Sequence, residues 1–193
     1  PEVPTSIAMR RDHKHNGARS WRGVKRDQWE GGHRVSFIAR WPGKINAGST
    51  SDQTVCLTDL MATASAITEA KLPNNSAEDS YNILSALLGK DTKPIRNYTL
   101  HQTISLAMAI RRGQWKYLDH KGSGGNNYGR EGRWGMKQYA LPEKSPNAPG
   151  QLYNLENDPG ETTNLYCDHP KIVKELIGKL EEFKKTGRSA PKQ

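Results

Sequence analysis

A short stretch near the start of the chain gathers the residue types that bind anions. Residues 21–34 read WRGVKRDQWEGGHR and set Arg22, Lys25 and Arg34 among three glycines. Glycine lets backbone N–H groups approach a ligand closely. Arginine offers a planar fork to two oxygens, whereas lysine offers a compact point charge. The stretch therefore indicates an oxyanion site, with a surface loop of solvated cations as the alternative.

Two histidines upstream of this stretch are further candidate ligands. His13 and His15 follow Asp12, and a His-x-His pair in an extended segment projects both rings to one side. A zinc site needs a third protein ligand, and none lies close in the sequence. We therefore interpret the two rings as hydrogen-bond donors to an anionic substrate rather than as metal ligands.

The sequence does not assemble a complete nucleophilic site. It contains no Gly-x-Ser-x-Gly motif, and neither Cys56 nor Cys167 has a neighbouring base in the sequence. The two cysteines can form at most one bridge and do not form a Cys-x-x-Cys pair, which excludes a disulfide framework and a zinc ribbon. Cysteine usage leaves the cellular compartment open.

The net charge favours anionic partners without selecting one. The 193 residues carry 29 Lys and Arg against 20 Asp and Glu, a formal charge of +9. These cations are spread along the chain, and no helix-turn-helix, RNP or zinc-finger pattern accompanies the five tryptophans. No apolar run reaches membrane-spanning length. Neither a nucleic acid nor a membrane is therefore the expected partner.

The candidate residues lie at the start of a chain whose first half alternates loops with regular elements. Residues 1–33 are polar without a sustained period, which predicts a long loop. Residues 35–41 alternate apolar and polar side chains, which predicts a core strand. Apolar residues at helical spacing then predict helices over 55–70 and 80–88, the second followed by Gly89 at its C′ position.

From about residue 94 the pattern becomes that of a small antiparallel unit. Residues 106–110 and 115–118 predict a hairpin that turns at Gly113. Residues 151–155 predict a further strand, and 170–185 an amphipathic helix. The element order suggests the end of an α/β sheet followed by an antiparallel α+β unit.

Several of these segments together resemble a known family. The segments are RGVK (22–25), WEGG (29–32), FIARWPG (37–43), LTDLM (57–61), AIRRGQWKY (109–117), QLYNLENDPGE (151–161) and TNL (163–165). In this order they resemble the C-terminal part of the formylglycine-dependent sulfatases of the alkaline phosphatase superfamily. The likeness is nearest to the bacterial N-acetylgalactosamine-6-sulfatase-like and arylsulfatase-like enzymes.

The resemblance implies an α/β fold, namely the C-terminal part of an alkaline-phosphatase-like sulfatase fold that ends in a small antiparallel α+β subdomain. Residues 1–93 would be the tail of the catalytic domain, with its active-site loop, a strand and two helices. Residues 94–193 would be the C-terminal subdomain. The family also implies a periplasmic or secreted protein, with any signal peptide upstream of Pro1.

The resemblance also implies roles for individual residues. Lys25 matches the catalytic lysine that contacts the sulfate. Gly31, Gly32 and Arg34 match the residues that shape the loop. By position and chemistry, the candidates for substrate contacts are His13, His15, Arg22 and His101. One departure is Ser36, where the family usually has proline.

Other parts of the family's machinery are not expected in this chain. The formylglycine arises from Cys/Ser-x-Pro/Ala-x-Arg, which the surroundings of Cys56 and Cys167 do not fit. Ser6 begins SIAMR, a literal fit that lacks the sequence the family places after it, so we interpret it as a chance match. The resemblance places the calcium ligands upstream of Pro1, which leaves no metal ligands in this chain.

The expected function is therefore the hydrolysis of sulfate esters, on a sulfated small molecule or glycan, by an intact protein that includes the N-terminal part of the catalytic domain. The isolated chain is expected to be inactive because it lacks the nucleophile and the calcium ligands. The alternative is a non-catalytic sulfatase-like or polyanion-binding module.

Overall fold

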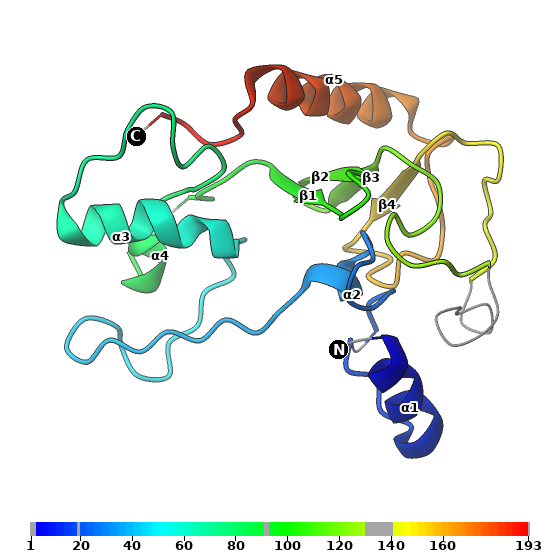
Figure 1. The fold of residues 1–193 in the computed structure, drawn as a ribbon, viewed down its shortest axis with the longest axis horizontal. Helices are drawn as coiled ribbons and strands as arrows, with labels where there is room; N and C mark the ends of the chain where they lie inside the picture. Colours follow the sequence, from blue (N-terminus) through cyan, green and yellow to red (C-terminus); the bar gives the residue numbers. More distant parts are fainter. Residues whose placement is uncertain (1–2, 19, 91–92, 130–140, 193) are drawn as a thin grey trace. The chain divides into compact units, whose positions relative to one another are not determined.

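The computed structural model describes residues 3–18, 20–90, 93–129 and 141–192. They form two compact units (Figure 1). The first unit combines the residues up to Val35 with Leu100–Leu180, and the second combines Ser36–Thr99 with the residues from Glu181 onward. The domain division expected between residues 93 and 94 stays a prediction.

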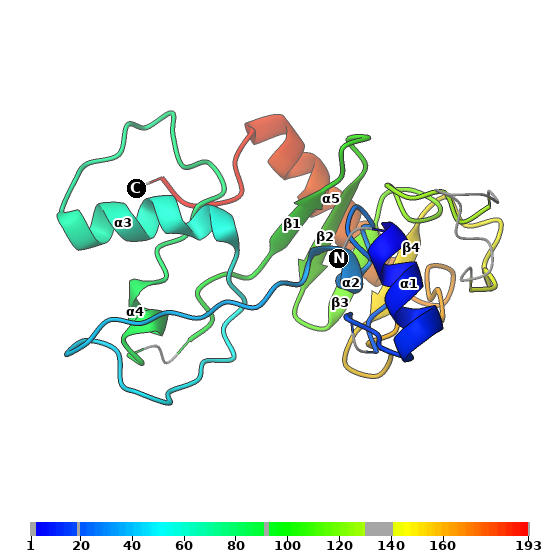
Figure 2. The same cartoon turned by 60° about the horizontal axis from the view of Figure 1, so that its bottom comes forward.

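The first unit is built on a four-stranded sheet in the order β1-β2-β3-β4 (Figures 1 and 2). Its strands are β1 (Thr99–Gln102), β2 (Met108–Arg112), β3 (Trp115–Leu118) and β4 (Gln151–Asn154). The β2–β3 and β3–β4 pairs are antiparallel. The turn between β2 and β3 uses Gly113 at φ +55°, a conformation that glycine adopts without strain. This confirms the predicted hairpin, with its first strand at Met108–Arg112 instead of 106–110, and the predicted final strand.

One face of the sheet packs against the helix α5 (Pro170–Thr186). The Trp115 ring lies 4.9 Å from the His169 ring just before α5, and Arg112 forms an ion pair with Glu175 on it. Val173, Leu176 and Leu180 are buried at helical spacing. The amphipathic helix predicted over 170–185 is thus confirmed, and its apolar stripe packs against a core, as its period required.

The other face of the sheet carries the short helix α2 (Glu30–His33) and the residues around it. Arg111 pairs with Lys116 across β2 and β3, and Lys116 pairs with Tyr153 across β3 and β4, so these three side chains share this face. Tyr153 also belongs to a buried core cluster, together with Trp29, Ala109, Leu118 and Leu155. The core of the unit therefore lies directly beneath the segment that carries the candidate residues.

The second unit contains the 3₁₀ helix η1 (Leu57–Asp59), α3 (Leu60–Thr68) and α4 (Leu84–Leu87). Asp59 is fully buried, forms an ion pair with Arg96, and accepts hydrogen bonds from the Cys56 N–H at 2.7 Å and the Tyr81 N–H at 3.0 Å. The predicted first helix is confirmed with a later start. The predicted second helix is limited to α4, whose C′ residue Gly89 has φ +65°.

The prediction of a long loop over residues 1–33 is wrong at both ends. The helix α1 (Val3–His13) occupies its first part, and α2 occupies its last residues. Basic side chains in the last turn of α1 favour the helix because they lie near the negative end of its dipole. The apolar period fails to reveal α1 because the sequence VPTSIAMRRDH has no apolar repeat at helical spacing.

The predicted strand over residues 35–41 is absent. In the part of the chain that the structure describes, this segment pairs with no strand. Val35 is 67% and Ile38 92% exposed, so the alternating side chains have no buried face. An alternating pattern produces a strand only when a neighbouring strand satisfies its backbone groups.

Among the described residues, no helix is long and apolar enough to cross a membrane.

Candidate functional site

Lys25 lies at an exposed position in a tight turn. The turn uses left-handed backbone at Gly23, with φ +88°, and at Arg26, with φ +84°. The buried Asp27 carboxylate closes it by accepting a hydrogen bond from the Val24 N–H at 2.8 Å. Aspartate is favoured in turns because its side chain can bond to nearby backbone in this way. The turn therefore holds the backbone at Lys25 while its side chain faces solvent.

A loop that follows β3 holds this turn in place through hydrogen bonds. This segment, residues 123–128, is called the clamp loop here. Asn126 Nδ2 donates to the Lys25 carbonyl at 3.0 Å and to Asp27 Oδ1 at 2.8 Å. The Tyr128 hydroxyl donates to Asp27 Oδ2 at 2.5 Å, and the Gln28 N–H donates to the Ser123 carbonyl at 2.7 Å. The clamp loop thus ties down the middle and the C-terminal end of the Lys25 turn.

The electrostatics of the clamp centre on Asp27. Burial raises the pKa of this carboxyl, and the hydrogen bonds from Tyr128, Val24 and Asn126 oppose the rise. Burial together with the neighbouring Asp27 charge also raises the pKa of Tyr128, so its phenol stays protonated and remains the donor in the pair.

A buried ionic cluster joins α2 to strand β3. Lys116 Nζ lies 3.0 Å from Glu30 Oε1, 3.2 Å from Glu161 Oε1 and 3.0 Å from His33 Nε2. The second oxygen of Glu161 accepts the Glu30 N–H at 2.6 Å. Arg34 Nε donates to Glu30 Oε2 at 2.7 Å. Burying these charges is tolerable because each has a partner of opposite sign at close range.

The pKa values in this cluster follow from burial and from the Lys116 charge. Burial raises the pKa of Glu161 to about 7, with Lys116 opposing the rise. Burial also acts on Glu30, but the charge of Lys116 outweighs it, and the pKa of that carboxyl is lowered. Burial and the Lys116 charge lower the pKa of His33 to about 3, so this ring is neutral at pH 7.

The predicted loop-shaping glycines lie where backbone segments approach closely. A Cβ added at Gly31 would lie 2.6 Å from the carbonyl oxygens of Arg22 and Gly23, and one at Gly32 would lie 2.0 Å from that of Asp27. The predicted Arg34 is on the same segment, and its guanidinium lies over the Trp21 ring at 4.3 Å. These contacts agree with a loop-shaping role, which stays a prediction.

The predicted substrate contacts fall in different places. Arg22 is half-buried over the Trp29 ring at 3.5 Å, and it donates to the Glu161 carbonyl at 2.9 Å. His101 stacks on His33 at 3.8 Å, and burial lowers its pKa well below the ordinary value. Arg22 thus contacts the ionic cluster through Glu161, and His101 contacts it through His33.

The remaining predicted contacts lie at the end of α1. His13 is the last residue of this helix, and His15 follows it. Both side chains are exposed. The extended His-x-His geometry assumed from the sequence is wrong, because a helix ends between the two rings and Lys14 has φ +52°. Their role as substrate contacts stays a prediction.

Sequence reasoning did not assign functional positions to Lys116, Glu161, Asp27 or the clamp loop. No clear signal marked Lys116, because a lysine between Trp115 and Tyr117 in the predicted strand 115–118 is expected on the face opposite to those two rings. No signal marked the clamp loop either, since Asn126 is 99 residues from its partner Asp27 and the contact depends on the fold. The arrangement as a whole carries the exposed Lys25 on a backbone turn that hydrogen bonds hold in place.

The comparisons identify the fold to which this arrangement belongs. No protein-family model matches the chain. An N-acetylgalactosamine-6-O-sulfatase of Bacteroides thetaiotaomicron is 33% identical over 177 residues, which cover 92% of this chain and 32% of that protein. An arylsulfatase of Hemicentrotus pulcherrimus is 30% identical over 175 residues, 85% of this chain and 31% of that protein. The chain belongs to the sulfatase family.

Solved structures agree with this assignment. A structure from work on glycosaminoglycan metabolism by Bacteroides thetaiotaomicron superposes with a TM-score of 0.71 at 32% identity, covering 86% of this chain and 32% of that one. The structure of Ps i-CgsB in complex with a neocarrahexaose has a TM-score of 0.61 at 24% identity, covering 88% of this chain and 32% of that one, and it supports the fold alone. The expected C-terminal portion of the sulfatase fold is confirmed, and the chain spans about a third of the relatives it matches.

In this sulfatase chain, segments that carry the sequence resemblance meet around one buried lysine. Lys116 comes from the segment 109–117, and its carboxylate partners come from WEGG at 29–32 and QLYNLENDPGE at 151–161. These segments are far apart in the sequence, so their joint presence reflects one packed centre rather than separate surface motifs. That centre positions α2 and, through it, the Lys25 turn of the sulfatase chain.

Proposed function

We propose that the protein carrying this chain hydrolyses sulfate esters of a carbohydrate and that Lys25 contacts the sulfate. The observation that carries the proposal is the exposed Lys25 in a turn whose backbone is fixed by Asp27 and Asn126. The names of the relatives support the class of reaction, and one relative is an ulvan-active sulfatase of Formosa agariphila, 32% identical over 163 residues and matched over 32% of its length. We extend these activities to the present protein as a proposal.

The chemistry of the proposal follows from a cation carried on a fixed backbone turn. Sulfate ester cleavage places negative charge on the bridging and equatorial oxygens. A cation already held at that position stabilises the charge without reorganising at the moment of reaction. Lys25 supplies the charge, and the clamp loop keeps its backbone in place. Arg22, held by Trp29 and the Glu161 carbonyl, is the proposed second cation.

The family's calcium does not fit the residues described here. Among them, no group of three or more His, Cys, Asp or Glu side chains is arranged to hold a metal ion. We therefore place the calcium ligands and the formylglycine nucleophile in a part of the protein outside this chain. That N-terminal part of the catalytic domain is the partner that the Lys25 turn requires. We also propose a periplasmic or secreted location, as the sequence resemblance implies.

The central test is Lys25→Ala in the full-length protein. Turnover of a 6-O-sulfated N-acetylgalactosamine substrate, or of another sulfate ester that the protein accepts, should fall by about 10²–10³, as for the loss of one charge-stabilising group. Lys174→Ala, on the exposed side of α5, is the matched control and should leave turnover unchanged. Unchanged turnover in Lys25→Ala would refute the assignment of Lys25.

A second test uses the 193-residue chain alone. We expect no turnover of sulfate esters, measured as released sulfate, because the nucleophile and calcium ligands lie elsewhere. Turnover by this chain would show that the placement is wrong. The alternative, a polyanion-binding module, predicts that even the full-length protein binds sulfated glycan in a salt-sensitive manner without cleaving it.

A further inference from the structure

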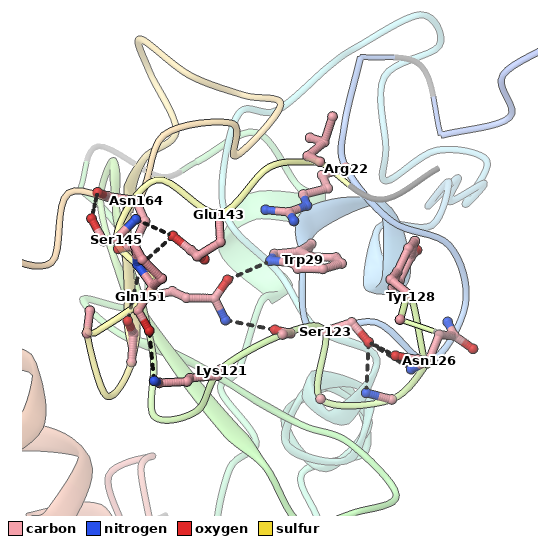
Figure 3. Close-up of a pocket in the computed structure, with 18 of the residues that line it drawn as sticks. Arg22, Trp29, Lys121, Ser123, Asn126, Tyr128, Glu143, Ser145, Gln151 and Asn164 are labelled. Atoms are coloured by element: carbon pink, nitrogen blue, oxygen red, sulfur yellow. Dashed lines mark hydrogen bonds between the residues drawn. The ribbon is translucent and has the colours of Figure 1, made fainter. Parts of the chain in front are cut away.

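The second unit contains a contact between two distant segments that the proposed function does not use. The proposed sulfate contact lies in the first unit, as does the polar cavity beside the Lys25 turn (Figure 3). In the second unit, residues 187–190 follow α5 and lie against residues 74–81, between α3 and α4 (Figures 1 and 2). The first segment is called the strap here, and the second is called the connection.

The connection receives hydrogen bonds from an arginine of the strap. Residues 74–81 form no helix or strand, so their carbonyl groups need partners from elsewhere. The Arg188 guanidinium supplies them. It donates to the carbonyl oxygens of Asn74 at 3.1 Å, Ser76 at 2.7 Å and Ala77 at 3.4 Å. Arginine suits this arrangement because its planar group carries several donors in fixed directions.

The backbone of the strap holds the second half of the connection. The N–H groups of Ser189 and Ala190 donate to the Glu78 carbonyl at 3.1 Å and 2.9 Å. The Ser189 N–H and hydroxyl also donate to Asp79 Oδ1, at 3.0 Å and 2.6 Å. The Tyr81 hydroxyl donates to the Ser189 carbonyl at 2.7 Å. Strap and connection therefore form one continuous network of hydrogen bonds.

The connection in turn holds the buried centre around Asp59. Ser80 Oγ accepts a backbone N–H of α3 at 2.8 Å, and the Tyr81 N–H donates to the Asp59 carboxylate at 3.0 Å. The Arg96 guanidinium, which pairs with Asp59, lies 4.4 Å from the centre of the Tyr81 ring. Arg96 also donates to Cys56 Sγ at 3.3 Å. The order of this centre thus depends on a connection that the strap holds.

The strap is held by hydrogen bonds more than by apolar packing. Of its four residues, Ala190 is buried, Gly187 is exposed and the other two are half-buried. Segments with few buried apolar contacts open locally at a low free energy. Gly187, at φ +64°, forms a left-handed turn after α5, so the strap can move away without distorting the helix.

We propose that the strap acts as a latch on the second unit. Docked on the connection, it keeps the Asp59 centre closed, and its release opens this centre to solvent. The half-buried Cys56 thiol reports the release, because its partner Arg96 packs on Tyr81 of the connection. This latch goes beyond the proposed sulfate contact and does not depend on it, because its residues all lie in the second unit.

The first test measures amide hydrogen exchange in the 193-residue chain by NMR. In Arg188→Ala we expect the amides of Tyr81 and Ile83, which donate to Asp59 and Thr63, to exchange about tenfold faster. An effect of this size is expected when hydrogen bonds to a charged group are lost. The amides of β3 and β4 in the first unit should keep their rates. Unchanged exchange at Tyr81 and Ile83, or an equal acceleration in the first unit, would overturn the latch.

Two further variants complete this test. Lys192→Ala changes an exposed basic residue just beyond the strap, and as the matched control it should alter neither set of amides. Asp79→Ala removes the carboxylate that accepts twice from Ser189, and it should also accelerate exchange at Tyr81 and Ile83. It decides the question if Arg188→Ala does not fold, and exchange as in the parent chain would then count against the latch.

Thiol labelling gives a second measure of the release. The chain has two cysteines, so Cys167→Ser leaves Cys56 as its single thiol. In that background, a thiol reagent should modify Cys56 about tenfold faster when Arg188 is replaced by alanine, in proportion to the population of the open form. Equal rates with and without Arg188→Ala would show that the strap does not control access to the Asp59 centre.

Discussion

Asp27 connects the two halves of the candidate site at the scale of single residues. It is 3% exposed, and its carboxylate accepts from the turn through the Val24 N–H and from the clamp loop through Asn126 and Tyr128. Lys25, by contrast, is exposed, and its place depends on its neighbours. The residue proposed to contact the sulfate is therefore positioned by a residue that remains buried.

Asp27→Asn tests this positioning. The amide keeps one oxygen for Val24 and Tyr128 but turns an N–H₂ group toward Asn126, which is itself a donor. We expect the free energy of unfolding to fall by about 1–3 kcal/mol, the cost of leaving a buried polar group unsatisfied. Urea denaturation of the 193-residue chain measures the change, with Asp52→Asn as the exposed control. A change no larger than the control's would show that the carboxylate does not hold the clamp.

At the scale of elements, periodicity succeeded where an element buries a face within this chain. The helix α5 and the strands β3 and β4 pack against one core, and the sequence located each within about two residues. Residues 35–41 have an equally clear alternation but pair with no described strand, and α1 forms without an apolar stripe. A periodic pattern of apolar residues indicates that one face of a helix or strand has to be buried. It does not identify the element that buries this face.

Two glycines provide a matched prediction at this scale. Gly178 lies inside α5 with open space around its Cβ position, whereas a Cβ at Gly125 would lie 1.8 Å from the Arg26 carbonyl oxygen. We expect Gly178→Ala to raise the free energy of unfolding by about 1 kcal/mol, the difference in helix propensity. Gly125→Ala should lower it, because the clamp loop must move away from the Lys25 turn. Thermal or urea unfolding compares the two, and equal effects would contradict the close approach at Gly125.

At the scale of the whole molecule, the sequence led to the family but not to the arrangement of its residues. The resemblance correctly indicated a C-terminal sulfatase portion, since the order of its motifs survives along the chain. The site needed the fold, because Lys116 meets Glu30 across 86 residues and Asn126 meets Asp27 across 99. Such contacts depend on strand pairing and loop packing, which no local pattern records.

The buried cluster makes the stability of the chain depend on pH, with two contributions of opposite sign. The folded-state pKa of His33 is about 3, below its ordinary 6.5, so the unfolded chain binds more protons between these values. Stability from His33 is therefore present above about pH 6.5 and is lost as the pH falls toward 3. Glu161 has a folded-state pKa of about 7, above its ordinary 4.5, so its contribution is present below pH 4.5 and is lost as the pH rises through 7.

Within the cluster the histidine contribution should prevail on acidification, because the pKa of His101 is lowered as well and two imidazoles then oppose the carboxyl of Glu161. Outside the cluster, the raised pKa of Asp27 adds to the side of Glu161. Between pH 6.5 and 4.5 we expect the urea midpoint of the chain to fall. His33→Gln retains an oxygen that can accept from Lys116 but removes one titrating group, so the fall should become shallower. Glu161→Gln removes the opposing group, so the fall should become steeper. Midpoints measured at several pH values give these slopes, and a change of slope in the same direction for both variants would contradict the assignment of the two groups.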